Sequence, residues 1–243
     1  KACASSSLIL MVQDLGTLPI QLFGNEAQKQ RFLPKCATGE WSPAFCLSAP
    51  EAGSDPASMR TSAKRDGDEW VTTGAKTLLT NAGIADFYVV MASTDRENRK
   101  TTAFIVEKDR EGFSIGGYEH KMGIKGSPTG SPVFEDVRVP HENVIGEADK
   151  GLPVALGTLE RTRLGAAAQA LGIAQGATDF ATQYAKERVT FGKPIFEHQA
   201  IAFKLAEMEA RIAAARELTY RASAAADRDE PGLAKWTSMA KLI

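Results

Sequence analysis

The stretch Cys46-Leu-Ser-Ala-Pro-Glu-Ala-Gly-Ser-Asp55 is the most informative part of this 243-residue chain. A strand-like run over Ser42–Leu47 breaks there into a turn rich in Pro, Gly, Ser and Asp. Small residues leave backbone N–H groups uncovered, and the hydroxyls of Ser48 and Ser54 add further donors. Such a loop can hold an anionic or carbonyl-rich ligand by its main chain, although an ordinary surface turn has the same composition. The stretch therefore predicts a strand that leads into a loop able to bind a ligand.

Two later segments strengthen this interpretation. Leu78-Leu-Thr-Asn81 and Arg188-Val-Thr-Phe-Gly-Lys-Pro194, taken with the loop over Cys46–Asp55, indicate a flavin site built from three separated parts of the chain. The dinucleotide fingerprint GxGxxG is absent and no strand–helix–strand rhythm supports one, so a Rossmann sheet is not expected. The motifs GxSxG and GxxxxGK(S/T) are also absent, which leaves no basis for a serine hydrolase or a P-loop enzyme.

The composition, with 43% hydrophobic and 24% charged residues, is that of a globular protein with a sizeable core. A formal net charge of −1 gives no reason to expect nucleic acid or an acidic membrane as partner. The cysteines Cys3, Cys36 and Cys46 have no CxxC spacing, so we expect reduced thiols in an intracellular protein. No apolar run reaches the roughly 20 residues that a membrane helix needs. The three histidines lack paired spacing, so no metal site is expected.

A helical pattern covers residues 1–37. Asn25 and Gln28 are placed as a capping box, in which each would satisfy a backbone N–H of the other. Pro34 and Gly39 are expected to end this segment.

Short runs of β-branched and aromatic residues alternate with turns from about residue 43 to 146, which predicts a small antiparallel sandwich or barrel. After Gly151 two apolar stripes at three- and four-residue spacing predict a bundle core or a subunit interface. The stripes are Leu164, Ala167, Ala168 and Leu171, and then Ile201, Leu205, Met208, Ile212 and Ala215. The predicted fold class is α+β, with a helical segment over 1–42, a β domain over 43–149 and an incomplete helical bundle over 150–243.

Both ends of the sequence look internal. It opens at Lys1, without an initiator Met, in an apolar segment, and it stops at Ala240-Lys-Leu-Ile243 within a helical pattern. No Gly or Pro stop signal is present there. We therefore expect an interior fragment of a longer enzyme, in which any targeting signal would lie outside the sequence.

Six motifs occur in an order typical of one enzyme family. They are Cys46–Asp55, Gly74–Asn81, Met122–Ser127, Val133–Pro140, Leu159–Arg163, and Glu187–Pro194 followed by Gln199–Ala206. On these motifs the chain resembles the acyl-CoA dehydrogenase family, and within it the short-chain and bacterial butyryl-type members. The resemblance runs over essentially all 243 residues. It implies the central part of such an enzyme, without its N- and C-terminal parts.

The resemblance implies FAD as the cofactor. The main chain over Phe45–Ser48 would hydrogen-bond the pyrimidine edge of the flavin, and Thr80 would donate toward flavin N5. Gly53 and Ser54 would lie against the pyrophosphate. The full set of implied cofactor-binding residues is Phe45, Cys46, Leu47, Ser48, Gly53, Ser54, Leu78, Leu79, Thr80, Arg188, Phe191 and Gln199, of which the last three would reach FAD across a subunit interface.

The resemblance also implies an acyl-CoA substrate, contacted by Ser54, Glu160 and Arg163. The implied reaction is α,β-dehydrogenation of the thioester to a trans-2-enoyl-CoA, in which a carboxylate removes the α-proton while the β-hydrogen leaves as hydride to flavin N5. Electrons would then pass to electron-transfer flavoprotein. A homotetramer, built as a dimer of dimers, is implied as well. The location implied is the bacterial cytoplasm, or the mitochondrial matrix if the protein is eukaryotic.

The chain departs from the family pattern at several positions. The catalytic Glu of most members would lie on a late loop after Ile243, and the position used by a minority, just before Arg163, is Thr162. No catalytic residue is therefore assigned, and the 243-residue fragment alone is expected to be inactive. Ala49 replaces the usual Glu of the loop, and Leu78 replaces the usual Trp beside the flavin. FAD binding is expected to survive both changes.

Two alternatives stay open. An acyl-CoA oxidase or a flavin monooxygenase would keep the same fold, and rapid reaction of the reduced flavin with oxygen would favour it over a dehydrogenase. A non-catalytic relative that keeps the scaffold for assembly would show no flavin absorbance.

Overall fold

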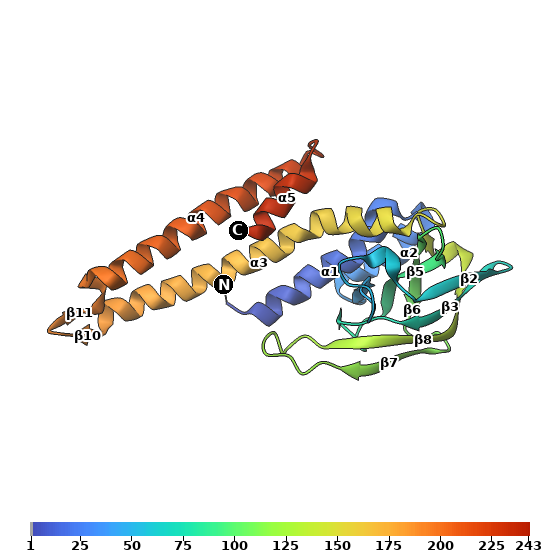
Figure 1. The fold of residues 1–243 in the computed structure, drawn as a ribbon, viewed down its shortest axis with the longest axis horizontal. Coiled ribbons are helices and arrows are strands. Elements are labelled where there is room, and N and C mark those ends of the chain that lie inside the picture. The colour runs from blue at the N-terminus through green and yellow to red at the C-terminus, as the bar shows by residue number, and fades with distance from the viewer. Residues whose placement is uncertain (1) are drawn as a thin grey trace. The chain divides into compact units, whose positions relative to one another are not determined.

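Two units divide the chain in the computed structural model, which describes residues 2–243. The β unit is Leu8–Leu159, and the helical unit comprises residues 2–7 and Glu160–Ile243 (Figure 1). The order of helices, strands and helices confirms the predicted fold class. The predicted division into three domains stays a prediction.

Two helices open the chain, α1 (Ala4–Phe23) and α2 (Glu26–Thr38). The capping box before α2 is present: Asn25 Oδ1 accepts from the Gln28 N–H at 2.9 Å, and Gln28 Oε1 accepts from the Asn25 N–H at 3.1 Å. Gly39 ends α2 in the left-handed conformation, with a φ of 78° that suits a residue without a Cβ atom.

The prediction that Pro34 ends the first helical segment is wrong. Helix α2 continues through Pro34 as far as Thr38. Phe32 and Cys36 lie one turn apart and are buried on the same face of the helix. Their packing against the sheet outweighs the single backbone hydrogen bond that a proline removes.

Helix α1 is long and apolar enough to cross a membrane by length and composition, and it is the only helix of residues 2–243 that meets this test. The sequence-based search for an uninterrupted apolar run did not find this helix, because Gln13 interrupts the apolar residues. In the structure Val12 and Ile20 are buried, and Gln13 Nε2 donates to the Cys36 carbonyl oxygen at 2.7 Å. These are the contacts of a core helix in the β unit.

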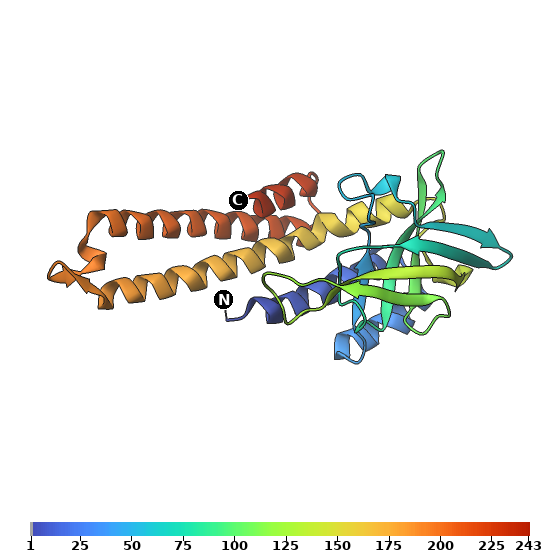
Figure 2. The ribbon, with the colours of Figure 1, turned by 60° about the horizontal axis from the view of Figure 1, so that its bottom comes forward.

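Nine strands form one mixed sheet in the β unit. They are β1 (Pro43–Cys46), β2 (Ser62–Asp66), β3 (Glu69–Ala75), β4 (Leu79–Thr80), β5 (Phe87–Asp95), β6 (Lys100–Glu107), β7 (Phe113–Tyr118), β8 (Thr129–Pro140) and β9 (Val144–Ile145). Their order is β4-β8-β3-β2-β5-β6-β9, with β1 beside β5 and β7 beside β8. The arrows in Figure 2 show strands of this sheet. The pairings are antiparallel, as predicted, except that β1 and β2 each run parallel to β5. The end of β1 is thereby anchored to a central strand.

Strand β5 is buried on both faces and separates two core clusters. Because side chains alternate along a strand, Tyr88 and Val90 enter one cluster while Phe87 and Val89 enter the other. Helix α2 covers the second cluster through Phe32, whose ring centroid lies 4.9 Å from that of Phe87. The loop that follows β1 therefore starts from a rigid part of the unit.

The helical unit is built on long helices joined by a short hairpin. Its elements are α3 (Gly151–Glu187, whose first residues belong to the β unit), β10 (Val189–Thr190), β11 (Lys193–Pro194), α4 (Gln199–Asp227) and α5 (Leu233–Leu242). The small residues Ala167, Ala222 and Ala240 are buried where these helices meet. Of the predicted stripe from Ile201 to Ala215, Ile212 alone is buried.

Candidate functional site

The loop over residues 47–55 is closed by its own backbone. Ala49 and Ala52 exchange two hydrogen bonds, each N–H donating to the carbonyl oxygen of the other at 3.0 Å. Further on, the Asp55 carboxylate forms an exposed ion pair with Arg99 at 2.6 Å. Ala49, which stands at a position where the resemblance expects Glu, is buried. The closure of the loop thus needs no side chain at this position.

This loop and strand β4, both predicted to bind flavin, lie side by side in the β unit. The Thr77 N–H donates to the Ser48 carbonyl oxygen at 3.1 Å, and Lys76 Nζ donates to the Leu47 carbonyl oxygen at 2.9 Å. Since β4 begins two residues after Thr77, these bonds hold the two segments together. The structure thereby joins two of the three segments on which the sequence-based flavin site was predicted.

Several donors on this surface are free for a ligand. Within residues 2–243, the hydroxyls of Ser48, Ser54 and Thr80 have no hydrogen-bond partner, and neither has the Ser48 N–H. Gly53 faces open space, because a Cβ atom built there would meet no atom within 4 Å. Uncharged donors beside open backbone fit the carbonyl edge of a flavin and the pyrophosphate of FAD.

Strand β4 is flanked by two residues in the left-handed region. Leu78 has a φ of 56° and Asn81 a φ of 64°. The Asn81 side chain is buried and donates to the Pro43 carbonyl oxygen at 3.2 Å. The Leu78 side chain is 63% exposed, at the position where the resemblance expects Trp. This geometry presents Leu78 and the Thr80 hydroxyl on the surface that carries the free donors.

Two buried titratable groups lie behind the loop. Burial raises the pKa of the Cys46 thiol to about 12 and lowers the pKa of Lys76 to about 8. Cys46 is therefore a neutral thiol that can offer a ligand its main chain but no nucleophile. Lys76 is fully buried and still protonated at neutral pH.

The third predicted segment forms a separate cluster in the helical unit. The Arg188 carbonyl oxygen accepts from the Ile195 N–H at 2.8 Å, which closes the β10–β11 hairpin. Phe191 at its tip is 97% exposed, and its ring contacts that of His198, the residue before Gln199. Arg188, Phe191 and Gln199 are all exposed. All three residues thus lie in the β10–β11 hairpin or beside its connection to α4.

The predicted substrate contacts Glu160 and Arg163 lie one turn apart on α3, and both are half-buried. Arg163 Nη1 donates to Ser238 Oγ of α5 at 3.1 Å. Thr162, which occupies the position of the minority catalytic base, is 7% exposed. A threonine hydroxyl cannot replace a carboxylate as base.

A cavity of about 390 Å³ beside β4 was not predicted as a site. Its lining includes Lys121, Lys125, Ser127 and Thr129. Thr129 pairs with Thr80 in the sheet, so the cavity lies beside the strand that carries Thr80. The Ser127 hydroxyl is buried without a partner. In the sequence, the signal for this cavity is the pair Lys121 and Lys125, which lie close to Gly and Ser residues. From the sequence alone this region was used only as a family motif.

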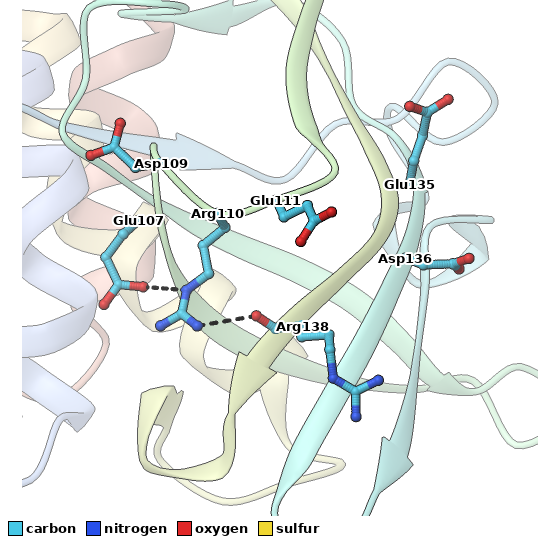
Figure 3. Close-up of a pocket in the computed structure, with 7 residues that line it drawn as sticks. All are labelled: Glu107, Asp109, Arg110, Glu111, Glu135, Asp136 and Arg138. Atoms are coloured by element: carbon cyan, nitrogen blue, oxygen red, sulfur yellow. Dashed lines mark hydrogen bonds and ion pairs between the residues drawn. The ribbon is translucent and has the colours of Figure 1, made fainter.

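A second cavity, of about 650 Å³, lies at the β6–β7 turn and β8 of the same unit. Five carboxylates and two arginines line it, with Arg110 donating to the Glu107 carboxylate at 2.8 Å (Figure 3). No group of three metal-ligating side chains occurs in the part of the chain that the structure describes. None of the residues predicted to bind flavin or acyl-CoA lines this larger cavity.

Comparisons with known proteins show the family of the chain. Three family models match: the N-terminal domain of acyl-CoA dehydrogenases over residues 1–40, the middle domain over 44–137 and the C-terminal domain over 149–243. A Mycobacterium tuberculosis protein described as a probable acyl-CoA dehydrogenase is 49% identical over 232 residues, which are 95% of this chain and 60% of that protein.

Solved structures give the same result. Butyryl-CoA dehydrogenase from Megasphaera elsdenii superposes with a TM-score of 0.95 at 42% identity, over 98% of this chain and 63% of that one. A chain from a structure described as an electron transferring flavoprotein of Acidaminococcus fermentans gives 0.94 at 40% identity, over 97% and 63%. This chain therefore spans about three fifths of the length of these relatives. From residue 1 to residue 243, the chain belongs to the acyl-CoA dehydrogenase family.

Proposed function

We propose that the full-length protein catalyses the FAD-dependent α,β-dehydrogenation of acyl-CoA thioesters to trans-2-enoyl-CoA and passes the electrons to electron-transfer flavoprotein. The observation that carries this proposal is the junction of the loop after β1 with β4, where Ser48 and Thr80 offer free donors at matching family motifs. Membership of the family over the whole chain supports it.

The residues around this junction suit FAD. Phe45, Cys46, Leu47 and Ser48 would present main-chain groups to the pyrimidine edge of the ring, beside Leu78, Leu79 and Thr80. Gly53 and Ser54 would approach the pyrophosphate, where a missing Cβ atom leaves the backbone open. When bound, FAD supplies the acceptor for the β-hydrogen of the acyl chain.

A second copy of the chain would complete the cofactor site. Arg188, Phe191 and Gln199 are exposed at or near the β10–β11 hairpin, and Arg188 has no ion-pair partner among the described residues. An arginine suits a phosphate because its charge is permanent and its donors form a fixed fork. We place these three residues against the FAD of a neighbouring subunit, within a homotetramer.

The substrate would be held by its CoA part. Glu160 and Arg163 on α3, with Ser54 on the loop, are the residues proposed to contact it. The basic cavity that contains Lys121, Lys125 and the unpartnered hydroxyl of Ser127 can take one of its phosphate groups.

Within this chain the described residues bind and orient, and none is assigned the transfer of the α-proton. Uncharged donors such as Thr80 favour electron density that builds on a bound ring without adding a fixed charge. Hydrogen-bond donors to the thioester carbonyl would lower the pKa of the α-C–H group. The carboxylate base is proposed to come from the part of the protein outside these 243 residues.

The test is anaerobic titration of the purified full-length protein with a series of saturated acyl-CoAs. Loss of flavin absorbance together with formation of enoyl-CoA is expected, followed by fast reoxidation by electron-transfer flavoprotein. The double variant Ser48→Ala/Thr80→Ala should bind FAD more weakly, while Ser114→Ala on the exposed face of β7 should not. Fast reoxidation by oxygen would indicate an oxidase or monooxygenase instead, and absence of flavin would indicate a scaffold protein.

A further inference from the structure

Lys76 is the one lysine among the buried side chains of residues 2–243, with an exposed fraction of 0%. Its ammonium group donates to the Leu47 carbonyl oxygen at 2.9 Å and contacts Met59 Sδ at 3.2 Å. No described carboxylate forms an ion pair with it, and Glu51 acts on it only through a longer-range charge interaction. Burying an ammonium group without a counter-ion is costly. Such a residue calls for an explanation beyond core packing.

The geometry of the peptide bond connects Lys76 to the ligand surface. In a trans peptide the C=O of one residue and the N–H of the next point in opposite directions, and the described chain contains no cis peptide bond. Because Lys76 Nζ holds the Leu47 carbonyl oxygen, the N–H of Ser48 must point away from Lys76. The side chain thus determines the direction of that N–H.

The next peptide, Ser48–Ala49, has both of its polar groups occupied by other partners. The Ser48 carbonyl oxygen accepts from the Thr77 N–H, and the Ala49 N–H donates to the Ala52 carbonyl oxygen. The Ser48 N–H is left without an acceptor among the described residues. Of the two consecutive peptides Leu47–Ser48 and Ser48–Ala49, the one that Lys76 orients is the one with a free donor.

We propose that Lys76 is a positioning residue that locks the Leu47–Ser48 peptide so that the Ser48 N–H donates to the bound flavin ring. This inference rests on the proposed function, since it needs FAD at the loop. The lysine contacts no ligand itself. It acts through the peptide that it holds.

The charge on Lys76 gives this role a second effect. Burial lowers the pKa of Lys76 to about 8, so the group is still protonated at neutral pH. A cation on a carbonyl oxygen polarises the peptide and makes its N–H a stronger donor. A stronger donor at the pyrimidine edge stabilises the reduced, electron-rich ring more than the oxidised ring.

The experiment compares Lys76→Met with the matched control Lys64→Met, whose lysine is exposed on β2, in the FAD-loaded full-length protein. Lys76→Met should bind FAD about tenfold more weakly, which is the usual effect of losing one hydrogen bond to a ligand, here the bond from the Ser48 N–H. It should also shift the flavin midpoint potential to a more negative value. Lys64→Met should change neither quantity. If Lys76→Met does not fold, Lys76→Gln replaces it, because it also lacks the ammonium group.

Amide hydrogen exchange separates this proposal from the proposed function. In the wild-type protein FAD should slow exchange at the Ser48 amide, and in the Lys76 variant that protection should be lost while the protection at Thr77 stays. The role of Lys76, but not the proposed function, would be overturned if the variant kept the wild-type FAD affinity and midpoint potential. The same holds if the Ser48 amide stayed unprotected in the FAD-loaded wild-type protein. A wild-type protein that binds no FAD would overturn the proposed function.

Discussion

Asn81 Nδ2 donates to the carbonyl oxygen of Pro43 at 3.2 Å and so joins the end of β4 to the first residue of β1. Both residues lie in segments that flank the proposed flavin surface. Asn81 also has a φ of 64°, a left-handed conformation that asparagine tolerates better than most residues. This buried side chain therefore adds to the contacts of Thr77 and Lys76 in fixing the relative position of the two segments.

Asn81→Ala should lower the free energy of unfolding by about 2 kcal/mol, of which about half comes from the hydrogen bond and half from the strained backbone. Asn81→Gly should lower it by about 1 kcal/mol, because glycine adopts a positive φ freely. Urea denaturation measures both values. Equal losses in the two variants would show that the backbone conformation contributes nothing.

Gln28→Ala should lower the free energy of unfolding by about 2–3 kcal/mol. Besides closing the capping box with Asn25, Gln28 Nε2 donates to the carbonyl oxygens of Glu142 at 2.7 Å and Val144 at 2.8 Å. Its removal leaves buried acceptors unpaired. The control is Gln30→Ala, on the exposed face of the same helix, with an expected change below about 0.5 kcal/mol. A similar loss in both variants would refute the tertiary role of Gln28.

The difference in stability between wild type and Lys76→Met should depend on pH between 7 and 9. Burial lowers the pKa of Lys76 to about 8 in the folded state, against about 10.4 in the unfolded chain. The unfolded state therefore binds more protons above pH 8, and this group makes the wild type more stable as the pH rises. The expected gain is about 1 kcal/mol from pH 7 to 9, relative to the variant.

The buried thiols have the opposite effect, since burial raises the pKa of Cys36 to about 11 and of Cys46 to about 12. The charge of Lys76 lowers the pKa of Cys46, so that pKa rises further in Lys76→Met, and the Cys46 thiol stays neutral up to pH 9 in both proteins. The comparison between pH 7 and 9 therefore isolates Lys76. Parallel stability curves, measured by urea denaturation at several pH values, would show that its pKa is not lowered.

Arg188→Ala should weaken FAD binding about tenfold or more without changing the stability of the FAD-free protein. Arg188 is exposed and its side chain forms no ion pair among residues 2–243, so its removal costs the fold little. The fluorescence of released FAD measures the affinity. Lys186→Ala, an exposed neighbour on α3, serves as the control and should leave the affinity unchanged. Loss of stability in the FAD-free variant would argue for a structural role.

Local patterns predicted much of the fold. The capping box at Asn25 and Gln28 depends on residues within one turn, and it is present as expected. The strand that ends at Cys46 and the loop after it could also be predicted, since they follow from β-branched, aromatic and turn-forming residues. Pro34 shows the limit of such reasoning, because the packing of Phe32 and Cys36 overrides a local stop signal.

Long-range contacts could not be predicted in this way. A single lysine in Gly74-Ala-Lys76-Thr has no local feature that distinguishes it from a surface lysine, and only the approach of Leu47 in three dimensions makes it a buried donor. The cavity at Ser127 likewise depends on the pairing of Thr129 with Thr80.

The sequence by itself determined the family, the order of helices and strands, and the loop that begins at Cys46, because these depend on motifs and on periodicity along the chain. The tertiary structure alone decided that β1 runs parallel to β5, that Thr77 and Lys76 hold the carbonyl groups of Ser48 and Leu47, and that one N–H is left free. The physical reason is that a backbone hydrogen bond or a buried charge is defined by its partner. That partner can lie at any separation along the chain.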